Sequence, residues 1–233
     1  MKSLVIIPAY NEQDAIVNTI TNLKKSCPET DYVIINDCSK DKTLQICKEN
    51  KFNVISLPVN LGIGGAVQTG YKYALKNNYD VAIQMDADGQ HDPIYLKELI
   101  TKVEQGYDLV IGSRFIEKQG FQSTFLRRMG INLYSTIIKI FTGKVIKDTT
   151  SGYRAASKKV IEIFAKSYPV DYPEPETNAF VAKNNLKIIE IPMKMKQRDT
   201  GTSSITPIKS IYYAIKVGLA VMLACILKNK EVQ

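Results

Sequence analysis

Residues 81–93 read VAIQMDADGQHDP, and this stretch directs the interpretation of the whole chain. Its first residues form an apolar run typical of a buried strand, and two acidic side chains, Asp86 and Asp88, follow where that strand ends. Ligands of α/β proteins bind at the carboxyl ends of strands. Carboxylates one residue apart can both reach one divalent cation and, through it, a phosphate. The stretch therefore indicates a metal-diphosphate site; the alternative is a polar turn that only starts a helix at Pro93.

The first half of the chain alternates short apolar runs with amphipathic helical patterns. Runs typical of buried strands occupy residues 3–7, 32–35, 54–57, 81–85 and 109–111. This alternation predicts an α/β fold with a mainly parallel central sheet flanked by helices. The strand ends would then gather six polar side chains on one rim: Asn11, Glu12, Asp37, Asp86, Asp88 and Arg114.

A glycine-rich loop follows the third predicted strand. Residues 62–67 read GIGGAV, which lacks the last glycine of a dinucleotide fingerprint and follows the wrong strand for one. No Gly-Lys-Ser/Thr follows, so it is not a P-loop either. We interpret the loop as a place where backbone packs closely beside the ligand, or as a purely structural feature.

The second half of the chain changes to longer, basic, amphipathic segments. The pattern predicts a helix within 121–141, a turn into a short strand at 148–154, a helix at 174–184 and an edge strand at 187–195. Residues 197–204 form a polar loop and residues 205–228 a last helix. We therefore divide the chain into one α/β domain, 1–204, and a C-terminal amphipathic helix, 205–233.

The last predicted helix raises the question of a membrane. Its longest uninterrupted apolar run, 217–227, has 11 residues, whereas a bilayer span usually needs about 20. The pattern favours a helix that lies at a membrane surface or packs on a partner. An ordinary helix packed on the domain is the alternative.

Charge is unevenly distributed along the chain. Residues 114–159 contain 10 Lys and Arg against 2 Asp and Glu, whereas residues 1–113 contain 11 against 14. The basic block favours an anionic partner: lipid phosphate, anionic lipid or nucleic acid. A nucleic-acid-binding module is disfavoured because no recognised nucleic-acid motif is present.

The cysteines and the start of the chain bear on location. The four cysteines form neither a CxxC pair nor a regular framework, which indicates reduced thiols. The first strand begins at about residue 3 and leaves no room for an export signal. We therefore expect a cytoplasmic protein.

Four motifs, taken in order, resemble those of the family 2 glycosyltransferases: PAYNE at 8–12, NDCSKD at 36–41, DADGQH at 86–91 and GSRF at 112–115. The run DTTSGYR at 148–154 and the loop with Arg198, Gly201 and Ser203 are similar to the branch with dolichol-phosphate mannose synthase and bacterial polyprenyl-phosphate glycosyltransferases. The resemblance implies the nucleotide-sugar-binding fold called GT-A. It covers nearly the whole chain.

The resemblance also implies roles for individual residues. Asp86 and Asp88 would face the donor diphosphate and a Mg²⁺ or Mn²⁺ ion, with Asp88 as the direct ligand. Gln90 would lie near the reacting centre and Arg198 would close over the donor phosphates. The donor base and ribose would be held by Pro8, Ala9, Tyr10, Glu12 and Asp37. The acceptor phosphate would be held by Arg114, Arg128 and Ser135.

The implied reaction moves a hexose or N-acetylhexosamine from a UDP- or GDP-linked donor to polyprenyl phosphate, with Asp88, Gln90 and Arg114 as catalytic residues. A phosphate acceptor is already an anionic nucleophile, so no base is needed, and in-line attack inverts the anomeric centre. His91, the only histidine, is interpreted as a packing residue. The alternative enzyme acts on a hydroxyl of a soluble acceptor and needs a base, for which Asp92 is the nearest candidate.

Two features that some relatives have are absent from this sequence. The Gln-x-x-Arg-Trp motif of processive polysaccharide synthases is missing, and the chain contains no tryptophan. The chain also lacks the pair of transmembrane helices that some polyprenyl-phosphate glucosyltransferases carry. We therefore expect peripheral attachment to the inner face of the cell membrane through the C-terminal helix, or through a small membrane-protein partner or a homo-oligomer.

Overall fold

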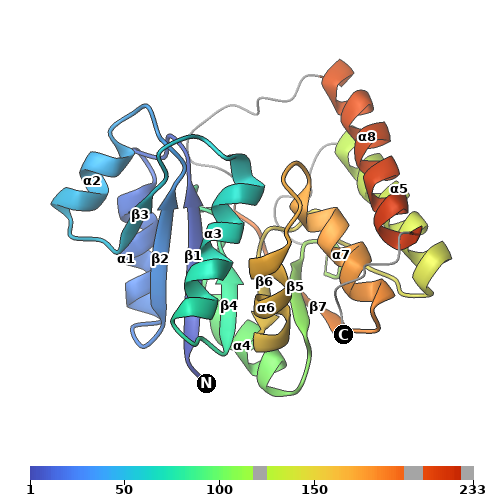
Figure 1. The fold of residues 1–233 in the computed structure, drawn as a ribbon, viewed down its shortest axis with the longest axis horizontal. Helices are drawn as coiled ribbons and strands as arrows, with labels where there is room; N and C mark the ends of the chain where they lie inside the picture. Colours follow the sequence, from blue (N-terminus) through green and yellow to red (C-terminus); the bar gives the residue numbers. More distant parts are fainter. Residues whose placement is uncertain (118–124, 197–206, 227–233) are drawn as a thin grey trace.

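The structure of the chain is a computed structural model that describes residues 1–117, 125–196 and 207–226 (Figure 1). Its centre is one seven-stranded sheet with the order β3-β2-β1-β4-β6-β5-β7. The strands are β1 (Ser3–Ala9), β2 (Asp31–Asn36), β3 (Val54–Ser56), β4 (Val81–Gln84), β5 (Leu109–Ser113), β6 (Arg154–Ser157) and β7 (Ile188–Pro192). The α/β fold predicted from the sequence is confirmed, including the strand at the edge near residue 190.

The sheet is parallel except for one strand. β1 pairs in parallel with β2 and β4, β2 with β3, and β5 with β7. β6 runs antiparallel between β4 and β5. Because β6 is reversed, it begins at the same edge of the sheet where its neighbours end. The segment that leads into β6 is therefore brought to the rim that carries the predicted site.

The inner strands are buried on both faces, as a sheet covered by helices requires, whereas the edge strands β3 and β7 are mostly half-buried. Alternate residues of β1 enter two separate apolar cores, Leu4 and Ile6 on one side and Val5 and Ile7 on the other. The second core is closed by α1 (Ile16–Ser26), α2 (Thr43–Glu49) and α4 (Leu96–Glu104), the last preceded by a short 3₁₀ turn at Pro93–Tyr95. The first is closed by α3 (Gly62–Lys76) and α6 (Lys158–Lys166).

Three further helices extend the first core away from the sheet. They are α5 (Phe125–Thr142), α7 (Pro173–Lys183) and α8 (Pro207–Ile226), and they pack on one another at one side of the molecule (Figure 1). Val217, Val221 and Cys225 of α8 are buried in the same apolar core. The last helix therefore packs on the domain through one of its faces. Among the described residues, no helix combines the length and the apolar content needed to cross a bilayer.

One strand boundary differs from the expectation for a reason that the register explains. The predicted first strand ended at Ile7, but β1 continues through Pro8 to Ala9, which pairs with Asn36. The Ile6 carbonyl accepts from the Met85 N–H on the β4 side, so alternate position Pro8 faces that side too. The β1–β4 pairing ends at Ile6, and the N–H that proline lacks is not needed there.

Some of the predicted features lie outside the described residues. These are Arg198 with the polar loop around it, and the predicted boundary at residue 204. All four cysteines lie in the described parts of the chain and are free thiols, as the sequence indicated.

Candidate active site

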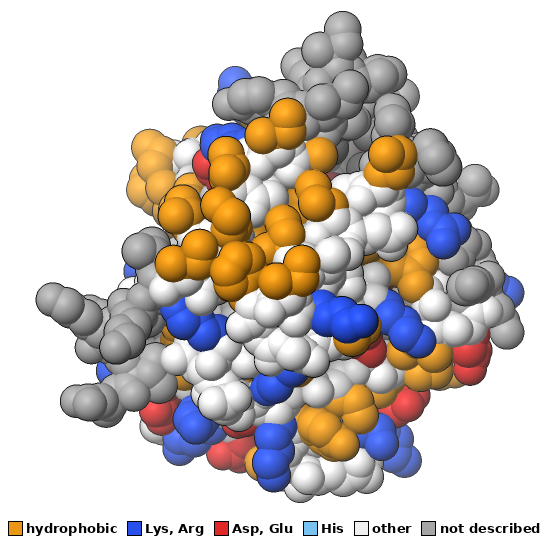
Figure 2. Space-filling model, turned by 90° about the vertical axis from the view of Figure 1, so that its right-hand side faces the viewer, with side chains coloured by type: hydrophobic (Ala, Val, Ile, Leu, Met, Phe, Trp, Pro, Cys, Tyr) orange, Lys and Arg blue, Asp and Glu red, His pale blue; other side chains and the backbone are white. Residues whose placement is uncertain are grey.

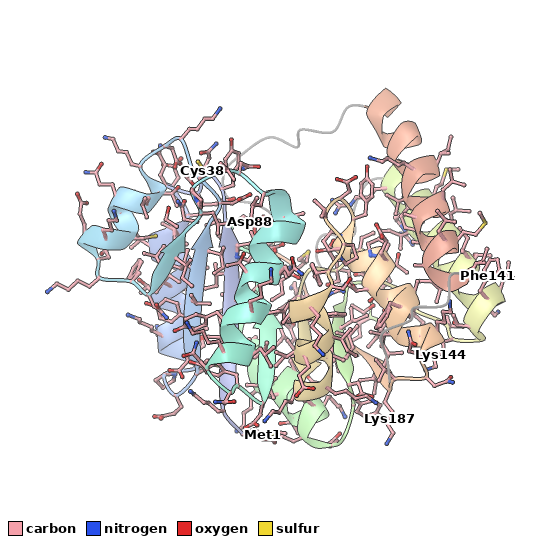
Figure 3. All side chains as sticks on the ribbon, viewed as in Figure 1. Met1, Cys38, Asp88, Phe141, Lys144 and Lys187 are labelled. Carbon is pink, nitrogen blue, oxygen red and sulfur yellow. The ribbon has the colours of Figure 1, made fainter. Side chains whose placement is uncertain are left out.

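Asp86 and Asp88 lie in a tight turn directly after β4. The Asp86 N–H donates to Nδ1 of His91 at 2.9 Å, and the Gln90 N–H donates to Oδ1 of Asp88 at 3.0 Å. Gly89, between them, has a φ of +76°, a left-handed conformation that favours glycine. Figure 3 shows Asp88 at the edge of the sheet where the strands end, on the same side as Cys38, which follows β2. The turn holds both carboxylates at this rim.

The two aspartates fit a divalent cation that is shared with a substrate. In the described parts of the chain, no group of three His, Cys, Asp or Glu side chains forms a metal site made by protein alone. Mg²⁺ is usually bound by one or two carboxylates together with substrate phosphates and water. The side chain of Asp86 is 36% exposed and can reach such a ligand. Asp86 and Asp88 therefore suit a Mg²⁺ or Mn²⁺ ion held jointly with a diphosphate.

His91 holds this turn in place through a hydrogen bond and through packing of its ring. Its ring is buried and stacks on Tyr153, with centroids 4.7 Å apart and planes 12° apart. Nδ1 accepts from the Asp86 N–H, so the ring is neutral, while Nε2 has no hydrogen-bond partner among the described residues. Burial lowers the pKa of His91 to about 4, against the opposing effect of the Asp88 charge. The interpretation of His91 as a packing and hydrogen-bonding residue agrees with this geometry.

The loops after β1 and β2 are joined by hydrogen bonds. The Asn11 N–H donates to Ser39 Oγ at 3.0 Å, and the Asn11 side-chain oxygen accepts from the Lys40 N–H at 2.8 Å. The Glu12 N–H donates to Thr43 Oγ1 at 2.8 Å. Asn11 has a φ of 58°, which asparagine tolerates better than most residues. Residues 10–13 thus have a fixed shape beside the acidic turn.

The predicted donor-binding residues occupy different environments in these loops. Pro8 and Ala9 are buried within β1, Glu12 is half-buried, and Tyr10 is 42% exposed on the rim. Asp37 is buried, and one of its carboxylate oxygens accepts the Leu61 N–H at 2.7 Å. Tyr10 is therefore the residue of this set with most exposed surface for binding a base. Asp37 instead joins the end of β2 to Leu61, just before the glycine-rich residues 62–67. Their roles toward a donor remain predictions.

The glycine-rich residues 62–67 were expected to form a loop, but they form the first turns of α3, and Gly64 there is a site of close backbone packing. A Cβ at Gly64 would collide with the carbonyl oxygens of Pro169 and Val170. Gly62, where α3 begins, has a φ of +74°. The first turn of α3 can therefore approach the segment before α7 only because glycines stand there.

The predicted acceptor-side arginines converge on one aromatic ring. The guanidinium carbons of Arg114 and Arg128 lie 5.2 Å and 5.5 Å from the ring centroid of Phe115. Arg128 is exposed, and Ser135 lies seven residues later, two turns along the same helix. The N-terminal part of α5 is thereby joined to the end of β5.

Arg114 has an additional, structural attachment. Its guanidinium donates to the Asp148 carboxylate from Nε at 2.7 Å and from Nη2 at 2.6 Å, and Nη2 also donates to Thr150 Oγ1 at 2.9 Å. Only 3% of the Arg114 side chain is exposed. Its predicted contact with an acceptor phosphate would therefore be made from a buried, already hydrogen-bonded position.

Two further residues, Gly152 and Glu174, lie near the turn that carries Asp86 and Asp88. Sequence reasoning assigned neither of them a role in the site. A Cβ at Gly152 would lie 3.1 Å from Gln84 Nε2 and 3.3 Å from both carboxylate oxygens of Asp86. Gln84 Nε2 donates to Glu174 Oε1 at 3.2 Å. Gly152 thus leaves room for Asp86 and Gln84, and Gln84 in turn binds Glu174. The SGYR run was part of the family resemblance, but no local pattern distinguishes Glu174 from other acids near a helix start.

A buried arginine lies behind these acids. Arg154 is fully buried, donates to the Ser151 carbonyl at 3.2 and 2.8 Å, and donates to Thr177 Oγ1 at 2.7 Å. It also opens β6 in register with Gln84. Arg154 therefore fixes the segment before β6 to α7, the helix that carries Glu174.

The segment after β7 runs beside the acidic turn. The Gln90 side chain donates to the Lys196 carbonyl at 3.2 Å, and the Lys196 N–H donates to the Gln90 carbonyl at 3.2 Å. Lys196 Nζ also pairs with Asp92 Oδ2 at 2.9 Å. Gln90 thus lies between the predicted metal ligands and the segment that leads toward Arg198.

Comparisons with known proteins agree with this geometry. Residues 4–164 match the model of the family described as "Glycosyl transferase family 2". An undecaprenyl-phosphate mannosyltransferase of Micrococcus luteus is 30% identical over 218 residues, 88% of each chain. A UDP-N-acetylglucosamine–dolichyl-phosphate N-acetylglucosaminyltransferase of Methanococcus voltae is 33% identical over 211 residues, 82% of this chain and 84% of that protein.

The fold is also found among solved structures. Glucosyl-3-phosphoglycerate synthase from Mycobacterium tuberculosis, solved with Mn²⁺, UDP and glucosyl-3-phosphoglycerate, matches with a TM-score of 0.69. The match covers 98% of this chain and 81% of that one at 17% identity, so it shows the fold alone.

Proposed function

Because the chain belongs to glycosyl transferase family 2, we propose that it transfers a hexose or N-acetylhexosamine from a UDP- or GDP-linked sugar to a polyprenyl phosphate. One observation carries the proposal. Asp86 and Asp88 follow β4, which lies next to β1 in the sheet, whereas Arg114 and Arg128 converge on Phe115 at the end of β5. A donor diphosphate and an anionic acceptor would thus be bound from opposite sides of one rim. The named acceptors of the two curated relatives, an undecaprenyl and a dolichyl phosphate, support the lipid acceptor.

On this proposal the chain's residues bind and align rather than move protons. The acceptor phosphate supplies an anionic oxygen that forms the bond to the anomeric carbon, and the nucleoside diphosphate leaves from the opposite face, so the configuration inverts. Asp86 and Asp88 would hold Mg²⁺ or Mn²⁺, which offsets the charge of the departing diphosphate. Arg128 would orient the acceptor phosphate, since a planar guanidinium can hold two phosphate oxygens. Arg114 would keep Phe115 and Arg128 in place.

A hydroxyl acceptor with Asp92 as its base fits the structure less well. Burial alone would raise the pKa of Asp92, but hydrogen bonds from Lys196 and from the Ile94 N–H outweigh burial and lower that pKa. A carboxylate held by a cation is a weak base for a neutral hydroxyl. Asp92 is better explained as the cap of the 3₁₀ turn at Pro93–Tyr95.

The lipid acceptor also bears on location. A polyprenyl phosphate is embedded in a membrane, so we place this enzyme at the inner face of the cell membrane, in peripheral contact with it. The second half of the chain supplies the basic surface that such a contact needs.

The test is a transfer assay with labelled nucleotide sugars and polyprenyl phosphate, with and without a chelator. Label should enter the organic phase, and transfer should be lost with chelator and in Asp88→Asn. Asp80→Asn is the matched control, because Asp80 lies just before β4, at the opposite end of that strand, where its carboxylate accepts the Lys2 backbone N–H. Transfer confined to water-soluble acceptors would refute the lipid acceptor, and a retained anomeric configuration in the product would refute inversion.

A further inference from the structure

α5 and α8 share an exposed apolar surface. Among the side chains of these helices that the structure describes, eight hydrophobic ones are each at least 44% exposed: Met129, Leu133, Ile140 and Phe141 of α5, and Ile215, Leu219, Leu223 and Ile226 of α8. We call these residues the α5–α8 face. Figure 2, seen from the side of the molecule where α5 and α8 lie, shows hydrophobic side chains gathered in one patch with Lys and Arg side chains beside it. A soluble monomer rarely exposes a large continuous apolar patch without a partner.

The exposure is a consequence of how the two helices pack. α5 buries Ile131, Tyr134 and Ile138, and α8 buries Val217, Val221 and Cys225, all in the core next to the sheet. The helices also meet each other at Gly218, where a Cβ would lie 3.6 Å from Leu133 and 3.8 Å from Ile137. The inner faces of α5 and α8 therefore supply the side chains that these helices contribute to the core. The outer apolar residues are each at least 44% exposed, so much of their apolar surface is left in contact with solvent.

The charge of the two helices indicates what covers this face. Together α5 and α8 contain five Lys or Arg residues and no Asp or Glu: Arg127, Arg128, Lys139, Lys209 and Lys216. Lys216 pairs with Asp171 at 3.0 Å, and Arg127, Arg128 and Lys139 of α5 are exposed. A second copy placed symmetrically on the same face would bring these basic residues together. An apolar surface on two helices that carry basic and no acidic side chains instead suits lipid tails beneath anionic headgroups.

We propose that the α5–α8 face is the docking surface of this chain for an anionic lipid bilayer. This proposal rests on the proposed function and makes its membrane contact specific: α5 and α8 bind together, and α8 does not act alone. Arg128 connects this surface to the active site, since its guanidinium lies on Phe115 at the end of β5. With the α5–α8 face on the bilayer, the basic side of the active site is close to the membrane surface where an acceptor phosphate lies.

The test is flotation with vesicles that contain no polyprenyl phosphate, so it reads the surface alone. The chain should float with phosphatidylcholine–phosphatidylglycerol vesicles, less with phosphatidylcholine alone, and less at high salt. The variant Ile140→Asp/Leu219→Asp, with one change in each helix, should lower the partition coefficient by at least about tenfold, since each charge would have to enter the apolar region. The milder Phe141→Gln/Leu223→Gln repeats the test with neutral side chains. Ile94→Asp is the matched control, because Ile94 is 70% exposed but lies outside α5 and α8.

Three outcomes would overturn the proposal. The first is equal flotation of the wild type and both double variants. The second is loss of flotation from a variant of α8 alone with no effect from Ile140→Asp. The third is a wild-type dimer in analytical ultracentrifugation that the variants dissociate, without vesicle binding, which would assign the face to a second copy. Activity on a detergent-dispersed, short-chain polyprenyl phosphate should persist in the variants. If the wild type shows no activity in that assay, the result counts against the proposed function and not against the docking surface.

Discussion

Arg114 and Asp148 form a bidentate ion pair that is almost fully buried, with Nε and Nη2 at 2.7 and 2.6 Å from the two carboxylate oxygens. Asp148 also accepts the backbone N–H of Arg114 at 3.0 Å. The pair joins the end of β5 to the segment that enters β6. Since a buried charge is costly without its partner, the pair fixes that segment at the rim of the active site.

Replacing Asp148 by asparagine should destabilise the fold strongly. Asp148→Asn leaves the Arg114 guanidinium buried beside a neutral amide, and breaking such a pair typically costs about 3–5 kcal/mol. Urea unfolding should show this as a lower midpoint with an unchanged slope. Asp171→Asn is the control, because Asp171 is exposed and pairs with exposed Lys216, a type of pair that contributes about 1 kcal/mol or less. Equal effects of the two substitutions would show that the buried pair contributes no more to the free energy of unfolding than the exposed pair does.

A methyl group at residue 152 should displace the Asp86 carboxylate without unfolding the protein. In Gly152→Ala the new Cβ would lie 3.3 Å from both Asp86 carboxylate oxygens, closer than ordinary contact, so Asp86 must shift. We expect the Mn²⁺ concentration for half-maximal transfer to rise several-fold, because metal ligands tolerate little displacement. In Gly218→Ala, the control, the nearest atom is at 3.6 Å, an ordinary contact. An unchanged metal requirement in Gly152→Ala would remove Gly152 from the site.

The first strands, their parallel arrangement and the position of the acidic rim could be predicted from the sequence. Each strand there is a local apolar run, and parallel strands place their following residues on one edge, so Asp37, Asp86 and Asp88 could be grouped without coordinates. That rule alone was enough to place the motif residues that follow those strands. Long-range pairing was not required.

The parts that sequence could not supply depend on pairing between distant segments. Nothing local in residues 154–157 says that β6 inserts antiparallel between β4 and β5, yet that insertion brings Asp148 and Gly152 to the site. Glu174 accepts a hydrogen bond from Gln84, a buried residue in the middle of an apolar run, and no local pattern predicts that contact. The amphipathic pattern of α8 likewise could not show that α5 would extend its exposed side.

Neutralising Asp92 distinguishes the two kinds of acceptor. If Asp92 were a general base for a hydroxyl, Asp92→Asn should lower the turnover number by about 100- to 10,000-fold. We expect less than about a tenfold change with polyprenyl phosphate, because that acceptor needs no base. The loss of the ion pair with Lys196, which is 57% exposed, should have only a small effect. Turnover at saturating donor, measured in parallel with Asp88→Asn, provides the comparison.

His91 should make the stability of the protein depend on pH in the mildly acidic range. Its pKa is about 4 in the folded chain, chiefly because of burial, against 6.5 for an ordinary histidine. As pH falls below 6.5 the unfolded chain takes up a proton that the folded chain does not, so the free energy of unfolding decreases, by up to about 1.4 kcal/mol per pH unit. Above pH 6.5 both states are neutral at this residue and the effect is absent.

The substitution His91→Asn isolates this contribution. Asparagine keeps an acceptor for the Asp86 N–H but does not titrate, so its stability should change less steeply between pH 6.5 and pH 5. Urea unfolding of both proteins at pH 7.5, 6.5, 5.8 and 5 measures the difference in slope, which is independent of any constant cost of the substitution. Acidic groups elsewhere are common to both proteins and cancel in the comparison. Parallel slopes would mean that His91 is protonated in the folded state as readily as in the unfolded chain, contrary to its burial against Tyr153.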